Sequence, residues 1–367
     1  MTATWCCVVP MPMIYLNLVL RHQVDLGHGR ISPMKVLITG GAGYIGSTIA
    51  NALLDTGHMP VLLDSLVTGQ RAFTEGKIFY QGDIADRGLL ERIFHEHPEI
   101  HSTVHCAALI VVPESVEQPY RYYLENVCKS LEFFKNVEEL GYPRVVFSSS
   151  ASIYDAVPGF KVTEASPLKP SSPYARTKYM MEMVLEDLSR ATALRGIALR
   201  YFNPIGADPR MRSGIHVREP SHVLGKMVDV ALGKLPEFTI TGVDWPTRDG
   251  SGIRDYIHVW DLAMAHVKAV EQFDVVMQKT ASPYAVINLG TGRGVTVKEL
   301  VAAFERVYGQ RIPQREAAPR PGDVAGAYAN ADRALDLLGW KAEFSIDQGI
   351  ASALEWGHKR KEILGYT

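Results

Sequence analysis

A glycine-rich turn directly after a short apolar run constrains this chain more than any other feature. The run Lys35–Thr39 reads KVLIT, and Gly40, Gly43 and Gly46 follow it at regular spacing. Glycine lets the backbone turn tightly and approach a phosphate closely, and the amides of a following helix face negative charge. The pattern predicts a strand, a dinucleotide-binding turn and a helix. An ordinary tight turn is the alternative that the glycines alone leave open.

The chain from Met34 alternates short β-branched runs with amphipathic stretches. Nearly continuous apolar strands separated by helices indicate a parallel sheet that is covered on both faces. We therefore predict an α/β fold, a Rossmann-type doubly wound parallel sheet with a smaller C-terminal substrate-binding lobe. The predicted strands are Lys35–Thr39, Pro60–Asp64, Lys77–Gln81, Ser102–Cys106, Arg144–Ser149 and Ile197–Arg200, and the predicted helices include Ser47–Leu54, Arg87–Phe94 and Tyr120–Leu140.

The alternation divides the chain into three parts. Residues 1–33 form a leader whose first 20 residues are apolar, but two prolines interrupt this stretch and no Lys or Arg precedes it, so a signal peptide or membrane span is disfavoured. We expect this leader to be disordered or not native, with a membrane-associating N-terminus as the alternative. Residues 34–202 form the predicted dinucleotide-binding domain. Residues 203–367 form the smaller lobe, and Tyr284–Leu289 is expected to return to the main sheet.

Composition excludes several classes of partner. The chain has 367 residues, of which 47% are hydrophobic and 21% charged, as in soluble globular proteins. A net charge of -2 offers no basic face for nucleic acid or for an anionic membrane. The cysteines Cys6, Cys7, Cys106 and Cys128 lack the spacing of metal ligands, so no metal site is predicted. A reduced chain in the cytoplasm is the simplest inference.

A carboxylate in the second strand indicates which dinucleotide is bound. Asp64 ends that strand about 20 residues after the glycine turn, where an acid accepts hydrogen bonds from the ribose hydroxyls and repels a 2′-phosphate. This favours NAD over NADP. Asp83 could reach the adenine, although it could equally be a turn or cap residue. The other predicted cofactor contacts near these strand ends are Tyr44, Ile45, Ile84, Cys106, Ala107 and Ala108.

A tyrosine and a lysine four residues apart are the predicted acid–base pair. The segment Ser171–Lys178 reads SSPYARTK, with a serine available as N-cap and Pro173 in the first helical turn. Tyr174 and Lys178 then share one helix face. A nearby ammonium should lower the pKa of Tyr174, so that the phenol can exchange a proton with a sugar hydroxyl. Alone, such a pair is commonly an amphipathic surface feature, but after the glycine turn it predicts hydride-transfer chemistry.

A serine run closes the fifth predicted strand, at the carboxyl edge where open parallel sheets bind ligands. We predict that Ser150 hydrogen-bonds the reacting oxygen, while Ser148 or Ser149 could simply satisfy backbone groups.

Two arginines are candidate anchors for a phosphate group of the substrate. Arg254 and Arg320 carry guanidinium groups that match phosphate oxygens in bidentate fashion. Each could instead form a structural ion pair, Arg254 with Asp255 and Arg320 with Asp323.

Taken together and in order, these motifs resemble those of the UDP-glucose 4-epimerase family, within the extended short-chain dehydrogenases/reductases. The resemblance spans about Met34 to Trp356, and its most specific parts are RYFNP and RDYIHV. It rests on TGGAGYIG, FSSSASIY, SPYARTK, LRYFNPIGADP, DGSGIRDYIHVWDLA, NLGTG and RPGDVAGAYAN.

The resemblance implies a tightly held NAD that is reduced and reoxidised within one turnover. Tyr174 would take the proton of the sugar 4-hydroxyl, Ser150 would bind the C4 oxygen, and Lys178 would contact the nicotinamide ribose. A 4-keto sugar would turn over in the pocket before it is reduced on its other face. Asn126 and Tyr201 are the further cofactor residues. The substrate residues are Asn203, His222, Arg254, Arg320, Asp323 and Ala327.

Two positions depart from the family pattern, and a third bears on which sugars the pocket accepts. Ile110 stands where many members carry a cofactor-contacting lysine, and Gly225 replaces a proline. Ala327 falls at the gate beside the sugar, where a small residue leaves room for an N-acetyl group. We therefore expect UDP-glucose and UDP-galactose as substrates and UDP-N-acetylhexosamines as plausible additional ones.

Other functions stay open at this point. A UDP-pentose or UDP-uronate epimerase would show the same motifs. A nucleotide-sugar dehydratase usually carries an Asp-Glu pair after its serine or threonine, whereas Ser150–Tyr154 contains no carboxylate. A silent NAD-binding regulator is the non-enzymatic alternative. The resemblance also implies a homodimer formed through Tyr120–Leu140 and Pro173–Leu188, with apolar surface from Met180, Met183, Val184 and Leu188, although burial within one subunit explains these side chains equally well.

Overall fold

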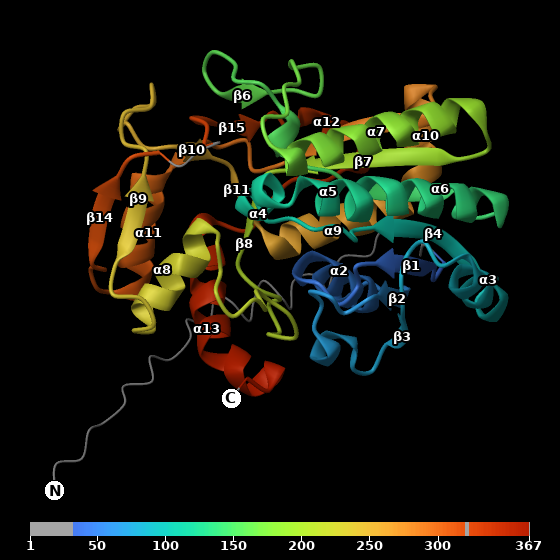
Figure 1. The fold of residues 1–367 in the computed structure, drawn as a ribbon, viewed down its shortest axis with the longest axis horizontal. Coiled ribbons are helices and arrows are strands. Elements are labelled where there is room, and N and C mark those ends of the chain that lie inside the picture. The colour runs from blue at the N-terminus through green and yellow to red at the C-terminus, as the bar shows by residue number, and fades with distance from the viewer. Residues whose placement is uncertain (1–31, 320–322, 367) are drawn as a thin grey trace, which may run out of the picture. The chain divides into compact units, whose positions relative to one another are not determined.

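A seven-stranded parallel sheet forms the centre of the computed structural model, which describes residues 32–319 and 323–366. All but the last two residues of the predicted leader, 1–33, lie outside the described range. The order of the strands is β12-β7-β5-β4-β1-β2-β3, and Figure 1 shows the sheet between two layers of helices. The predicted α/β, Rossmann-type fold is confirmed. The strands are β1 (Lys35–Thr39), β2 (Met59–Asp64), β3 (Ile78–Gln81), β4 (Ile100–His105), β5 (Arg144–Ser148), β7 (Arg195–Tyr201) and β12 (Tyr284–Leu289).

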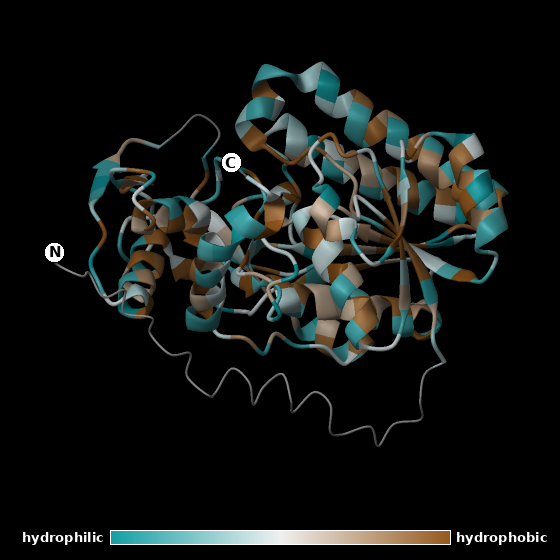
Figure 2. Ribbon diagram, turned by 90° about the horizontal axis from the view of Figure 1, so that it is seen from below, coloured by the Kyte–Doolittle hydropathy of each residue, from teal (hydrophilic) through white to brown (hydrophobic). Residues whose placement is uncertain are grey.

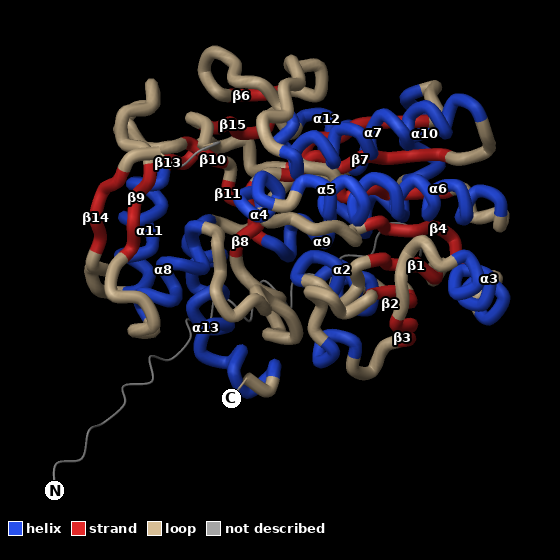
Figure 3. The backbone as a smooth tube through the Cα atoms, viewed as in Figure 1, coloured by secondary structure: helices blue, strands red, loops and turns tan. Residues whose placement is uncertain are grey.

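Alternate strand residues face opposite sides of the sheet, and each side has its own core. Val36 and Ile38 of β1 join one apolar cluster, whereas Leu37 joins the other. Helices α2 (Tyr44–Asp55), α9 (Val259–Glu271), α10 (Phe273–Thr280) and α12 (Asp332–Leu338) cover the first side. Helices α3 (Arg87–Glu96), α6 (Lys129–Glu139) and α7 (Pro173–Ala191) cover the second. The blue helices and red strands of Figure 3 display this layering.

The helical segment predicted over Tyr120–Leu140 is confirmed, but its middle is not a regular α-helix. The structure divides it into α5 (Pro119–Tyr122), a π-helical turn η2 (Tyr123–Cys128) and α6. A π-turn accommodates one extra residue and re-aims side chains, and such turns are frequent at functional sites. Here it carries Asn126, whose side chain is fully buried. The short helix α4 (Val112–Glu117) precedes α5, and two 3₁₀ turns occur at η1 (Arg71–Thr74) and η3 (Ala151–Ile153).

The second half of the chain builds a smaller lobe with a separate apolar core. Its helices are α8 (Val223–Ala231), α11 (Val297–Tyr308) and α13 (Ile346–Leu364). Strand β12 comes from the same half but pairs with β7 in the main sheet. Figure 2 shows apolar strands at the centre and hydrophilic residues on the outer sides of the helices. Short strands complete the lobe and its junction with the sheet: β6 (Lys161–Val162), β8 (Asn203–Ile205), β9 (Phe238–Thr241), β10 (Ile253–Arg254), β11 (Tyr256–His258), β13 (Val295–Thr296), β14 (Gln314–Ala317) and β15 (Gly326–Ala329).

Within residues 32–319 and 323–366, no helix combines the length and the apolar character that crossing a membrane requires.

Candidate active site

Close backbone contacts make glycine necessary in the turn after β1. Gly40 has a φ of 69°, and a Cβ there would lie 2.8 Å from the amide nitrogen of Ala107. A Cβ on Gly46 would lie only 2.2 Å from the carbonyl oxygen of Gly40. The turn therefore presses against the end of β4 and against the first turn of α2, as in a dinucleotide-binding loop.

The amino terminus of α2 is open to an anionic ligand. Gly43 is its N-cap and provides no side-chain cap, and no acidic residue stands in the first turn. A Cβ on Gly43 would meet only the carbonyl of Gly40, at 3.3 Å. Amides at such a terminus favour a diphosphate. Of the two predicted contacts next to it, Tyr44 donates a hydrogen bond of 2.6 Å to the carbonyl of Gly206, and Ile45 packs against the core.

Asp64 lies beside the glycine turn, as predicted from its position at the end of β2. Its carboxylate accepts hydrogen bonds from the amide of Ala42 at 2.9 Å and from the amide of Leu66 at 2.8 Å. Burial raises the pKa of Asp64, while these amides oppose the rise. A carboxylate has about four acceptor positions. It can therefore still accept hydrogen bonds from ribose hydroxyls, and the residues at this edge fit an NAD molecule.

The contacts of Asp83 favour its structural alternative. Its carboxylate forms an ion pair of 2.6 Å with Lys129 and accepts a hydrogen bond from the amide of Ala85 within its own turn. The neighbouring Ile84 is buried in the core.

The end of β4 is held by the π-turn. Asn126 accepts a hydrogen bond of 2.8 Å from the amide of Leu109 and donates one of 2.9 Å to its carbonyl. It also donates to the hydroxyl of Thr177 on α7 at 3.1 Å. Asn126 therefore fixes the segment after β4 relative to the helix of the predicted acid–base pair. Ala107 and Ala108 lie in this segment, directly after β4.

Cys106 connects the ends of β4 and β5. Its sulfur lies 3.1 Å from the hydroxyl oxygen of Ser148, and burial raises the pKa of its thiol to about 11. Cys106 and Cys128 are both free thiols.

The predicted acid–base residues meet at the carboxyl edge of the sheet. Helix α7 begins at Pro173, with Ser172 as its N-cap. Burial raises the pKa of the Tyr174 phenol, and the nearby hydroxyl of Ser150 opposes this rise. Lys178 is buried and donates a hydrogen bond of 2.9 Å from Nζ to the carbonyl of Ser148. Burial lowers its pKa to about 8.

The expected effect of the lysine on the tyrosine needs correction. We expected the ammonium of Lys178 to lower the pKa of Tyr174, but the net shift of that pKa is upward. The physical reason is that burial of the phenol outweighs the favourable contacts. Lys178 instead directs a proton to the backbone at the end of β5.

The other two serines of the run do more than satisfy the backbone. Ser148 lies 3.0 Å from Nε2 of His266, in addition to its contact with Cys106. Ser149 donates a hydrogen bond to the carboxylate of Glu182. The suggested backbone role of these hydroxyls was wrong, because the buried side chains of neighbouring helices offer partners.

Sequence reasoning missed the buried ion pair of Glu182 and Arg200. The two side chains are joined by contacts of 2.6–3.1 Å, and both residues are almost fully buried. Arg200 also donates to the hydroxyl of Tyr154 at 3.0 Å. The sequence contained a signal for Glu182. It follows Lys178 by four residues, as Lys178 follows Tyr174, so all three side chains lie on one face of α7.

Two further predicted residues lie at the end of β7 and at the start of β8. Burial raises the pKa of the Tyr201 phenol well above the usual value, and the Ser148 hydroxyl opposes this rise. Asn203 begins β8 and donates its backbone N–H to the carbonyl of Asp255 at 3.0 Å.

Among the predicted phosphate ligands, Arg254 contacts backbone carbonyls. Its guanidinium donates to the carbonyl oxygens of Ala325 at 2.9 Å and Val324 at 3.1 Å. Gly326 makes room for it, since a Cβ there would lie 2.2 Å from Nη1 of Arg254. In the parallel pairing of β10 with β15, Arg254 stands opposite Ala327.

Of the two predicted substrate residues in the RPGD segment, the structure describes only one. Arg320 lies outside the described residues, and Asp323 lies at the start of the second described range. The carboxylate of Asp255, considered above as a partner of Arg254, accepts hydrogen bonds from the amides of Thr291, at 2.9 Å, and Ala329, at 3.1 Å.

The departure at Gly225 has a local explanation. His222 is the N-cap of α8, and its ring accepts a hydrogen bond of 3.2 Å from the amide of Gly225. A Cβ on Gly225 would lie 2.4 Å from Pro220 and 2.8 Å from the His222 ring, so only glycine fits. Burial lowers the pKa of His222 to about 4. At the other departure, the side chain of Ile110 is exposed.

Comparison with known proteins agrees with this geometry. Residues 36–290 match the NAD dependent epimerase/dehydratase family. The chain belongs to this family. It is 40% identical over 343 residues to the UDP-glucose 4-epimerase of Bacillus subtilis, an alignment that covers 91% of this chain and 99% of that protein.

Solved structures of the same family are also similar. The UDP-glucose-4-epimerase of Stenotrophomonas maltophila, crystallised with NAD and formylated UDP-arabinopyranose, is 37% identical with a TM-score of 0.84, covering 90% of this chain and 99% of that one. The UDP-glucose 4-epimerase of Bifidobacterium longum, in complex with NAD+ and UDP, is 36% identical with a TM-score of 0.83, covering 89% and 98%.

Proposed function

We propose that this chain is an NAD-dependent enzyme that reversibly epimerises a UDP-hexose at C4, interconverting UDP-glucose and UDP-galactose. The observation that carries the proposal is the approach of Tyr174 and Lys178 to the serine run at the carboxyl edge of the sheet, where Lys178 donates to the carbonyl of Ser148 at 2.9 Å and the Ser150 hydroxyl lowers the pKa of Tyr174. In the same family, relatives that bear the name UDP-glucose 4-epimerase align over nine-tenths of the chain. Bound NAD supplies a hydride acceptor, and later a hydride donor, at the sugar C4.

Tyr174 is the proposed general base and acid. Its phenolate takes the proton of the sugar 4-hydroxyl as C4 is oxidised, and the phenol returns a proton when the 4-keto sugar is reduced on its opposite face. Ser150 donates a hydrogen bond to the C4 oxygen and holds it next to the phenol. Lys178 binds the nicotinamide ribose, and its ammonium stabilises the phenolate once a bound ligand replaces part of its backbone contact. Burial excludes water, which protects the keto sugar.

The two halves of the chain divide the binding work in this proposal. Residues 34–202 hold the cofactor through the predicted turn and strand-end residues, with Asn126 and Asp83 in supporting positions. Residues 203–367 hold mainly the nucleotide sugar, with the diphosphate bound by arginine. The proposed substrate residues are Asn203, His222, Arg254, Arg320, Asp323 and Ala327.

The small side chain of Ala327 supports a broader substrate range. It stands opposite Arg254 in the strand pairing, so it borders the predicted diphosphate site. A methyl group there leaves space that a bulkier residue would fill. We propose that UDP-N-acetylhexosamines are accepted as well.

A homodimer in the cytoplasm completes the proposal. Apolar side chains are exposed on α4–α6 and on the adjoining α7, which supports pairing of these helices with a second copy. Met180 and Met183 belong to this exposed set, whereas Val184 and Leu188 pack against the sheet core of their own subunit. The exposed set is Val116, Tyr120, Leu124, Leu131, Met180 and Met183.

The proposed cytoplasmic location is supported by the cysteines, because the free thiols of Cys106 and Cys128 are typical of a reducing compartment.

A panel of UDP-sugars tests the proposed reaction. Purified protein is incubated with UDP-glucose, UDP-galactose, their N-acetyl forms, a UDP-pentose and a UDP-uronate, without added NAD, and the products are resolved by chromatography. We expect C4 epimers of the hexoses. Turnover of the pentose or uronate alone would move the assignment to those sugars, and loss of water from the substrate would indicate a dehydratase. Bound NAD with no turnover of any sugar would indicate a regulator.

A further inference from the structure

A segment of the C-terminal half lies between α2 and α13 and forms hydrogen bonds with both helices. We call residues 206–217 the strap. The strap begins at Gly206, which accepts the hydrogen bond from Tyr44 at the start of α2. It ends next to α13, where Arg360 donates to the carbonyl of Val217 at 3.2 Å. The strap therefore links the first helix after the glycine turn to the last helix of the chain.

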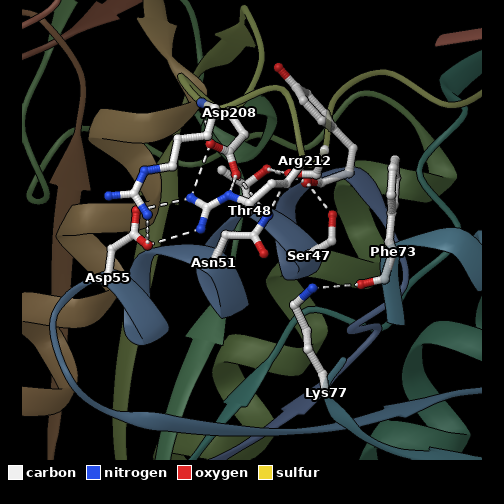
Figure 4. A network of polar contacts seen from close by, with 11 residues as sticks. Ser47, Thr48, Asn51, Asp55, Phe73, Lys77, Asp208 and Arg212 are labelled. Atoms are coloured by element: carbon white, nitrogen blue, oxygen red, sulfur yellow. Dashed lines mark hydrogen bonds and ion pairs between the residues drawn. The ribbon is translucent and has the colours of Figure 1, made fainter. Parts of the chain in front are cut away.

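The contacts between the strap and α2 are buried and polar. Thr48 and Ser213 share a hydrogen bond of 2.9 Å, and Asn51 donates to Asp208 at 2.8 Å. Arg212 adds contacts to Asp208 and to Asp55 at the end of α2. Figure 4 shows the guanidinium of Arg212 between the carboxylates of Asp208 and Asp55, with Asn51 of α2 beside it. Since this network occupies one side of α2 along its length, the strap is fixed relative to the glycine turn.

Helix α13 holds the other edge of the strap. Trp356 donates from its indole to the carbonyl of Ile215 at 2.8 Å, and Tyr366 donates to the carbonyl of His216. Gly214 allows the close approach, since a Cβ there would lie 2.6 Å from the indole ring of Trp356. Phe73 packs against the same indole, with ring centroids 6.0 Å apart.

His216 reaches from the strap to the loop that borders Asp64. Its Nε2 lies 2.8 Å from the carbonyl oxygen of Thr68, so Nε2 carries the proton and donates. The loop folds closely over the carboxylate, because a Cβ on Gly69 would lie 2.7 Å from Oδ1 of Asp64. The next residue, Gln70, also joins the loop to the glycine turn, because its backbone N–H donates a hydrogen bond of 2.9 Å to the carbonyl of Ala42.

We propose that the strap is the element that retains the dinucleotide, and that His216 is a positioning residue that acts through the carbonyl of Thr68 on the loop over Asp64. This loop and the glycine turn enclose the side where the adenosine ribose binds, so the bound nucleotide leaves only when they separate. The inference rests on the proposed function only in that NAD occupies this edge. It assigns cofactor retention to the C-terminal half, which is otherwise the sugar-binding half.

The test measures how fast NAD is lost from the purified full-length protein. Bound NAD is quantified after acid release at intervals of dialysis against nucleotide-free buffer. In His216→Phe the carbonyl of Thr68 loses the hydrogen bond from Nε2, and we expect NAD loss to accelerate about tenfold. His216→Gln can still donate and should retain NAD nearly as the wild type does. His101→Phe is the matched control, because it also alters a histidine with an unpaired buried Nδ1, but at the amino end of β4.

A second variant keeps the proposal testable even if His216→Phe does not fold. Ser213→Ala removes the strap contacts to Thr48 and Asn51 and leaves His216 intact, and it should also accelerate NAD loss. Circular dichroism confirms that each variant is folded. Wild-type rates of loss in folded His216→Phe and Ser213→Ala, or equal acceleration in His101→Phe, would overturn the inference while the proposed function stands. Wild-type protein that binds no NAD even at saturation would overturn both.

Discussion

The catalytic face of α7 and the arginine region around β10 and β15 are built in different ways. On α7, Tyr174, Lys178 and Glu182 each meet one residue of the serine run at the end of β5. Around β10, Arg254 donates to carbonyls of its own strand and of residues 324–325. In the first region, contacts between the helix and the end of the strand fix the orientation of the reacting side chains. In the second region, hydrogen bonds to backbone carbonyls fix the orientation of one charged side chain.

This difference indicates what each region contributes. Groups that move protons need fixed mutual geometry, which short buried contacts between a helix and a strand end provide. A group that binds a diphosphate needs charge and reach, and backbone carbonyls can hold a guanidinium until a phosphate competes for it. We therefore expect changes on α7 to lower kcat and changes around β10 to raise KM.

Replacement of Tyr174 by phenylalanine should have the largest effect. The variant keeps the ring but has no group that can exchange a proton with the sugar, so kcat should fall by about 10³-fold, within the range of acid–base catalysis. Product formation from UDP-galactose measures it, and NAD content and circular dichroism serve as controls. Undiminished activity in a folded, NAD-loaded Tyr174→Phe protein would remove the catalytic assignment.

Replacement of Arg254 by lysine should raise KM more than it lowers kcat. Lysine keeps the charge but cannot offer two parallel donors to a phosphate, and the loss should be about 10-fold in KM, as for hydrogen bonds to charged groups. Steady-state kinetics with UDP-glucose separate the two constants. Arg248→Lys is the matched control, because Arg248 pairs with Glu299 on the surface. An Arg254→Lys variant that loses only kcat would contradict the comparison.

Replacement of Ala327 by tyrosine should narrow the range of substrates. The larger ring fills space beside the sugar, so turnover of UDP-N-acetylglucosamine should fall about 10-fold or more relative to UDP-glucose, as expected for a steric difference in a binding pocket. The ratio of kcat/KM for the two sugars measures this effect. If wild-type protein rejects N-acetylated and smaller hexoses equally, the proposed role of Ala327 is wrong.

Replacement of Glu182 by glutamine should have the smallest effect, a shift in the pH dependence of kcat. The lowered pKa of Lys178, about 8, means that its ammonium persists below this pH and is lost above it. Wild-type kcat should therefore decline as pH rises through about 8. The charge of Glu182 raises the pKa of Lys178, so Glu182→Gln should move the decline to lower pH.

The matched control for this shift is Glu186→Gln, one turn further along α7, where Glu186 pairs with the exposed Arg190. Its profile should follow that of the wild type. An unchanged profile in a folded Glu182→Gln protein would show that the buried ion pair has no influence on the lysine.

Much of the cofactor side could be predicted because its signals are local. The strand Lys35–Thr39 was predicted with its observed ends, and the five other predicted strands all overlap observed ones. Gly40 and Asp64 were predicted from their spacing, and the structure places both at the expected edge of the sheet. Such residues act through the backbone next to them, so their effect can be inferred without the rest of the fold.

The missed features depend on partners that are distant in sequence. The π-turn around Asn126 interrupts a segment whose apolar spacing predicted one helix. The pair of Glu182 and Arg200 joins a helix and a strand, and the bond from His216 to Thr68 spans 148 residues. Spacing along the chain contains no information about these contacts.

The sequence by itself determined the order of strands and helices, the glycine turn, and the one helix face that carries Tyr174 and Lys178. Only the tertiary structure decided which serine each of these side chains meets, in which direction burial shifts their pKa values, and that the C-terminal half is tied to the cofactor edge. The reason is that hydrophobic periodicity and backbone sterics act over a few residues. Burial and hydrogen-bond partners are instead set by segments that the fold brings together from far along the chain.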